Sequence, residues 1–138
     1  MKTSARNQLY GEIVSIKEGQ VNAEVILKLK ENTMIVSAIT LHSLKELGWK
    51  VGMQCYVLIK SKWVVVFKEE SKQLSLRNIL VGVVKSIKGG SVNAEIEIDS
   101  NGVPLCALIT EESRENLDLE VGEKVWFGFK ANNVILGI

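Results

Sequence analysis

The segment Val21-Asn22-Ala23-Glu24-Val25 occurs twice in this chain, the second time as Val92-Asn93-Ala94-Glu95-Ile96. In both copies apolar residues alternate with polar ones, and the alternation continues for several residues beyond the segment. A period of two is typical of an antiparallel strand that buries one face. We therefore expect a half-buried strand at each copy, with Val21 and Val92 on the same face as the apolar residues that follow them.

The repeat extends outward from this segment over the whole chain. The matched residues keep the same order in both copies, with one deletion in the second. Although 138 residues suggest one domain by length, the repeat predicts two, at 1–68 and 74–138, joined by a polar linker at 69–73. The other matches are Arg6-Asn7-Gln8-Leu9 with Arg77-Asn78-Ile79-Leu80, Ser15-Ile16-Lys17 with Ser86-Ile87-Lys88, Ile39-Thr40 with Ile109-Thr110, and Val51-Gly52 with Val121-Gly122.

Each half predicts the same series of elements: three strands, a short helix and two further strands. This is the order of an OB-type barrel, so the expected fold class is all-β, with two tandem OB-like five-stranded β-barrels that each carry one short helix. The strands predicted for the first half are 9–17, 21–29, 34–39, 54–59 and 63–67, and the last three predicted for the second are 105–109, 124–129 and 133–136.

Particular residues predict the ends and turns of these elements. Thr40 and Thr110 are expected to cap the N-termini of the helices, and Gly48 the C-terminus of the first. Asn101-Gly102 predicts a tight hairpin turn. Gly11, inside a predicted strand, indicates a bulge or a bend there.

The charge balance excludes several classes of partner. Lysine and arginine total 17 against 16 aspartate and glutamate residues, so the net charge is +1. Without a basic excess, and with 6% aromatic residues, the chain is a poor binder of nucleic acid. No apolar run approaches the roughly 18 residues of a membrane span, and the N-terminus lacks the apolar core of a signal peptide. We expect a soluble, cytoplasmic protein.

Metal ligands and catalytic motifs are scarce. Cys55 and Cys106 lie in apolar stretches without the spacing of a zinc or iron–sulfur site, so we expect reduced core residues. His42 is expected on the surface, near the start of the first helix. The sequence also has no nucleophile elbow, paired His and carboxylate, or phosphate-binding loop. It therefore indicates a protein that is not an enzyme and that holds no metal through its own ligands.

The small size of each half favours assembly with other copies. A barrel of about 65 residues buries only about 60% of its unfolded surface, so it often needs a disulfide, a metal or a partner. With the first two excluded, self-association remains. Four aromatic residues either face a partner or simply fill the core: Trp63, Trp126, Phe127 and Phe129.

A set of small polar and cationic groups also repeats at the predicted strand ends. Hydroxyl, guanidinium, ammonium and backbone N–H groups donate hydrogen bonds, and donors suit a small oxyanion. The alternative is that the cations are solvated and the threonines only cap their helices. The set comprises Ser4, Arg6, Thr40, Lys60 and Ser61 in the first half, and Ser75, Arg77, Thr110, Lys130 and the backbone of Ala131 in the second.

These residues, together with the segment at 21–25, resemble the Mop (TOBE-type) molybdate-binding domain, and the whole chain is similar to the tandem di-Mop proteins, or molbindins. The resemblance implies a Mop barrel in each half and a homotrimer that stores molybdate or tungstate in the cytoplasm. The donor set would form one type of site, split between subunits. A second type, near the symmetry axis, would use backbone donors of Val21, Asn22 and Ala23, or of Val92, Asn93 and Ala94.

The second copy departs from the family pattern, and other functions remain open. Ile79 replaces Gln8 and Ala131 replaces Ser61, so the second copy loses a hydroxyl donor and its sites are expected to be weaker or to rely on main chain. The chain could instead be an oxyanion-sensing module that acts through a separate partner, since related domains occur in molybdate regulators and transporters. Molybdate and tungstate are nearly equal in size, so the sequence does not separate them.

Overall fold

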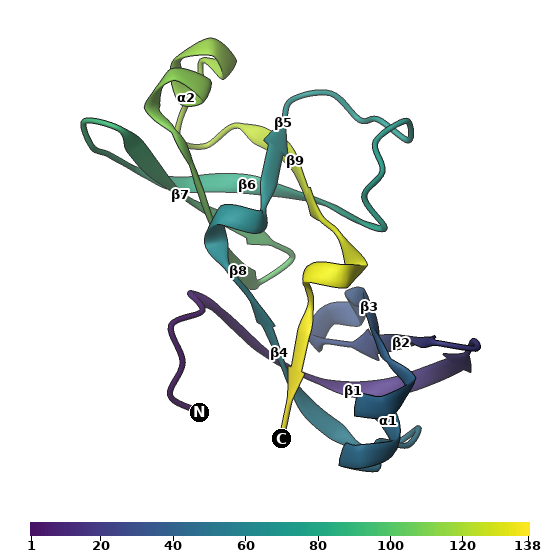
Figure 1. Ribbon diagram of the computed structural model, residues 1–138. Coiled ribbons are helices and arrows are strands. Elements are labelled where there is room, and N and C mark those ends of the chain that lie inside the picture. Colours follow the sequence, from purple (N-terminus) through teal and green to yellow (C-terminus); the bar gives the residue numbers. More distant parts are fainter.

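Two curled five-stranded sheets make up the chain in the computed structural model, which describes residues 1–138 apart from the side chain of residue 31 (Figure 1). One short helix accompanies each sheet, α1 (Leu41–Leu47) and α2 (Glu111–Leu117), which confirms the predicted all-β fold class. The strands of the first sheet lie in the order β10 (Ile135–Gly137), β4 (Gln54–Ile59), β1 (Asn7–Glu18), β2 (Asn22–Lys28), β3 (Met34–Thr40). The strands of the second sheet lie in the order β5 (Val65–Phe67), β9 (Lys124–Phe129), β6 (Asn78–Gly89), β7 (Asn93–Ser100), β8 (Val103–Thr110).

The fifth strand of each sequence repeat lies in the sheet of the other repeat. β5 pairs with β9, with Val66 opposite Phe127, and β10 pairs with β4, with Leu136 opposite Val57. In Figure 1 the yellow β10 runs away from β9 and down beside β4. The expectation that each half completes its own barrel is therefore wrong in the pairing of this strand.

Short 3-10 helices at the crossover explain this exchange. η2 (Ser61–Trp63) follows β4 and packs against β8, and η3 (Ala131–Asn133) follows β9 and packs against β3. Each turn carries the chain to the opposite sheet, where it meets a strand equivalent to the one it left. Residues 1–68 and 74–138 thus describe sequence repeats, whereas each folded unit takes strands from both.

The predicted caps and the hairpin are present. Asn101 and Gly102 have φ values of 50° and 86° between β7 and β8, and this pair of positive angles fits the primed turns that join twisted strands. The Thr40 and Thr110 hydroxyls accept hydrogen bonds from the backbone N–H groups of Ser43 and Ser113. Gly48 ends α1 in the left-handed conformation, as expected.

Gly11 has a different role from the predicted one. The bulge of β1 lies between Ile13 and Ser15, not at Gly11. A Cβ atom at Gly11 would lie 2.8 Å from Leu29 Cδ2 and 3.0 Å from the Lys28 carbonyl oxygen. The glycine is therefore needed because the β1 backbone passes close to the end of β2.

The inward faces of the strands form the core. Phe127 and Phe129 are fully buried, so of the two alternatives for these rings the core is correct, while Trp63 and Trp126 are half-buried. Val21 is 73% exposed although it continues the apolar period of β2, because the strand begins only at Asn22. Its equivalent, Val92, is 68% exposed. Neither helix in the described residues has the length and apolar character to cross a membrane.

Candidate functional site

The two repeated arginines pair with carboxylates of the opposite half. Arg6 Nη1 lies 2.8 Å from Glu95 Oε1, and this hydrogen bond raises the pKa of the guanidinium. Arg77 donates to both oxygens of Glu24, at 2.9 and 3.1 Å. Both arginine side chains are about half exposed, at 47% and 54%. In the single chain these predicted anion ligands are therefore already engaged, and an oxyanion would have to exchange with a carboxylate.

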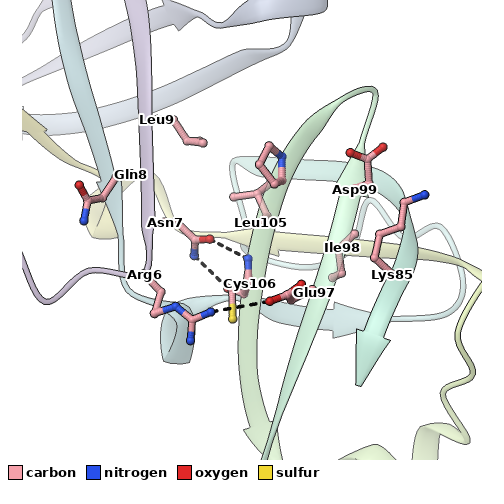
Figure 2. Close-up of a pocket in the computed structure, with 11 residues that line it drawn as sticks. Arg6, Asn7, Gln8, Leu9, Lys85, Glu97, Ile98, Asp99, Leu105 and Cys106 are labelled. Atoms are coloured by element: carbon pink, nitrogen blue, oxygen red, sulfur yellow. Dashed lines mark hydrogen bonds and ion pairs between the residues drawn. The ribbon is translucent and has the colours of Figure 1, made fainter. Parts of the chain in front are cut away.

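The asparagine next to each arginine joins the halves at a strand edge. Asn7 Nδ2 donates to the Cys106 carbonyl at 2.9 Å and its Oδ1 accepts from the Cys106 N–H at 2.7 Å (Figure 2). Asn78 makes the same two bonds with Val36, at 2.8 and 2.7 Å. Both amides are buried. Sequence reasoning did not assign them this role, although their repetition at the start of β1 and β6 was a signal.

The predicted hydroxyl and lysine donors have separate local roles. Thr40 and Thr110 cap their helices, as the alternative interpretation held. Lys60 Nζ lies 5.7 Å from the centroid of the Trp63 ring, a cation–π distance. In the second half Asn133 replaces the tryptophan, and Lys130 is exposed. The serines at positions 4 and 75 are exposed ahead of β1 and β6.

Because of the strand exchange, segments of different sequence halves that carry predicted donors pack together. η2, which begins with Ser61, packs against β8, the strand that ends at Thr110. A cavity of about 520 Å³ there is lined by residues of both, including Lys62, Thr110 and Ser113. η3, which begins with Ala131, packs against β3 in the same way. The sequence grouped the donors within each half, whereas the structure groups these segments across the halves.

The backbone segments of the second predicted site type lie beside the threonines of the first. Asn22 is opposite Thr40 in the β2–β3 register, and Asn93 is opposite Thr110 in β7–β8. A cavity of about 330 Å³ includes Asn22 and Ala23. The carboxylates of Glu18 and Glu24 line the same cavity, as does Lys17, a cation that the prediction did not include. Its repetition as Lys88 was the signal that could have identified it.

A third cavity lies between the halves and carries balanced charge. It measures about 280 Å³, and Figure 2 shows Arg6 and Lys85 on its wall together with Glu97 and Asp99. Two cations facing two carboxylates leave no net positive field that would attract an anion to this cavity.

The cysteines provide no reactive or ligating group. Both are buried free thiols, as expected. Burial raises the pKa of Cys55 to about 11 and also raises that of Cys106, so both remain protonated near neutral pH. Across the described residues, no three side chains of His, Cys, Asp or Glu lie together as metal ligands.

Comparison with known proteins finds two copies of one domain. The TOBE domain family matches residues 3–66 and 74–136. The chain is 35% identical over 140 residues to the molybdenum-pterin-binding protein MopA of Rhodobacter capsulatus, and 34% identical over 139 residues to the molybdenum transport protein ModE of Azotobacter vinelandii. These alignments cover the full chain but 53% and 52% of the two relatives, so the chain spans about half their length.

A solved structure matches over the full length of both chains. It is the cytoplasmic molybdate-binding protein ModG, in a crystal form with molybdate bound. The two chains are 38% identical and superpose with a TM-score of 0.95, and the match covers 100% of this chain and 99% of ModG. The similarity therefore includes the arrangement of the two halves, not just the fold of one.

Proposed function

Because the chain belongs to the TOBE domain family, with one copy in each half, we propose that it binds molybdate. The observation that carries the proposal is the full-length match to molybdate-bound ModG, with a TM-score of 0.95. The relatives named above are binding and transport proteins, which supports a binding role and not a catalytic one.

The chemistry of the candidate donors fits this ligand. Molybdate is a dianion without a proton to donate near neutral pH, so a pocket of donors matches its oxygens. Hydrogen phosphate would leave its own proton unpaired in such a pocket, at a cost of about 1–3 kcal/mol. Sulfate carries the same charge and no proton, so it must be rejected by size.

We place the sites where the donor sets meet other copies of the chain. Two types are proposed: one from the hydroxyl, lysine and arginine donors at the strand ends, and one from the backbone around Asn22–Ala23 and Asn93–Ala94. In the first type, Arg6 and Arg77 exchange their carboxylate partners for the anion. The exposed Val21 and Val92, next to the second type, support burial against a further subunit. The proposed assembly is a homotrimer that stores molybdate or tungstate in the cytoplasm.

Calorimetric titration of the purified chain with molybdate, tungstate and sulfate tests this function. We expect molybdate and tungstate to bind at micromolar or tighter affinity and sulfate to bind more weakly. Absence of molybdate binding in this range contradicts the proposal. Native mass spectrometry with and without molybdate then gives the number of subunits and anions, and a monomer contradicts sites between subunits.

A second candidate function is oxyanion sensing through a partner protein. The match to about half of ModE, and to the transcriptional regulator ModE of Yersinia pestis at 31% identity, favours this alternative. A pull-down from cell extract with and without molybdate tests it. Capture of a regulator or transporter only when molybdate is present supports sensing, and identical capture in both conditions contradicts it.

A further inference from the structure

The turns before the two Asn-Ala segments differ in the side chain that the following helix places over them. In the second copy, the first residue of α2 is Glu111, and its side chain is 16% exposed. Its Oε2 accepts a hydrogen bond from the Gly90 N–H at 3.2 Å, while Oε1 is paired with Arg114. A carboxylate is thus held over the turn that leads into Val92 and Asn93.

The first copy has the same backbone arrangement without the carboxylate. Leu41 N donates to the Val21 carbonyl at 2.8 Å, as Glu111 N does to Val92, also at 2.8 Å. Within the turns, Gly19 N donates to the Asn22 carbonyl at 2.8 Å and Gly90 N to that of Asn93 at 2.9 Å. The backbones of the helices and turns are therefore equivalent, and two side chains differ. Glu111 replaces Leu41 at the start of the helix, and Gly89 replaces Glu18 before the turn.

Charged groups near the first turn leave its cavity available. Lys17, Glu18 and Glu24 line the cavity beside Asn22 and Ala23, and Glu24 is already paired with Arg77. Glu18 is exposed, whereas Glu111 is held by a backbone donor and an arginine. The carboxylate of Glu18 is therefore free to turn toward solvent when an anion enters, and that of Glu111 is not.

We propose that the Glu111 carboxylate competes with an oxyanion for the second copy, so that the oxyanion binds preferentially beside Asn22 and Ala23 in the first. The inference rests on the proposed molybdate binding and adds which copy is filled. At the second copy an incoming dianion meets a carboxylate that Arg114 holds in place, and it must also compete for the Gly90 N–H that Glu111 already uses. The sequence repeat thus gives two unequal sites.

Reciprocal variants of the full chain test this inequality. Glu111→Leu gives the second copy the residue of the first, and Leu41→Glu does the opposite. With sodium molybdate in calorimetry, we expect Glu111→Leu to add binding sites or to strengthen the weaker class about tenfold, and Leu41→Glu to weaken the stronger class about tenfold. Hydrogen–deuterium exchange locates the effect: molybdate should protect residues 19–23 in the wild type, and also 90–94 in Glu111→Leu.

A charge-only variant keeps the test valid if the leucine variant does not fold. Glu111→Gln retains an oxygen acceptor for Gly90 and removes the charge, and it should also strengthen the second copy. Equal protection of both segments in the wild type overturns the inference, as do unchanged sites in both Glu111 variants. If the wild type binds no molybdate, the proposed function fails and this inference fails with it. Binding without any difference between copies overturns the inference alone.

Discussion

The Arg-Asn pair at the start of each half links the two halves through two kinds of bond. The arginine forms an exposed ion pair with a carboxylate on β7 or β2. The asparagine forms two hydrogen bonds with one residue of β8 or β3, buried at Asn7 and partly buried at Asn78. Exposed pairs contribute about 0–1 kcal/mol, whereas a buried backbone group left without a partner costs about 1–3 kcal/mol. The asparagines therefore stabilise the junction, and the arginines remain available for exchange with an anion.

Replacing Asn78 by alanine should destabilise the protein more than most polar substitutions. The change removes both bonds to Val36 and leaves its N–H and carbonyl groups without these partners. We expect the free energy of unfolding to fall by about 2–4 kcal/mol in urea titrations followed by circular dichroism. Asn132→Ala, at an exposed position of η3, serves as the control. A loss at Asn78 no larger than that of the control contradicts the assigned role.

The buried thiol of Cys55 should make stability depend on alkaline pH. The unfolded thiol loses its proton near its ordinary pKa of 9.0, whereas the folded thiol keeps it until about 11. Stability from this group is thus complete below pH 9 and is lost as the pH rises toward 11, because the unfolded state binds fewer protons. Urea titrations at pH 8 and pH 10 should show a larger loss in the wild type than in Cys55→Val. Equal losses would contradict the prediction.

At the scale of the elements, the alternating sequence predicts where the strands lie but not how every strand is paired. The period of two, the Asn101-Gly102 turn and the threonine caps depend on neighbouring residues, so the sequence predicted the strands, the hairpin and the helix starts. The partner of β5 depends on which of two equivalent strands it meets. Nothing in the repeat distinguishes β4 from β9 as that partner. For the same reason the sequence did not predict that η2 packs against β8 and η3 against β3.

Removing the second half should therefore deprive the first of a strand. Residues 1–68 alone lack β10, and their own β5 lies in the other sheet. Because the two halves are repeats, we expect two copies of this fragment to exchange β5 and form a dimer, measured by size-exclusion chromatography with light scattering. In Val66→Asp the exchanged strand would place a charge at a buried position, so this variant should not dimerise. A folded monomer of 1–68 contradicts the prediction.

At the scale of the whole molecule, the net charge of +1 is a sum of charges that are grouped locally. Arg6 and Arg77 neutralise carboxylates across the junction, and Lys17 lines the cavity beside Asn22. The average charge argues against a large polyanion as a partner and is compatible with a small anion. A few donors placed where chains meet can bind a dianion without making the protein basic.

Sites shared between subunits should couple anion binding to assembly. An anion that binds only the assembled, folded state adds stability that grows with its concentration, by about 2.7 kcal/mol at one hundred times its dissociation constant. We expect molybdate to raise the melting temperature, and this temperature to rise also with protein concentration, because unfolding separates the subunits. Sodium chloride at matched ionic strength is the control, since screening alone would act on the exposed ion pairs. A melting temperature that rises with molybdate but is independent of protein concentration would place the site within one chain, and an equal rise with sodium chloride would contradict specific binding.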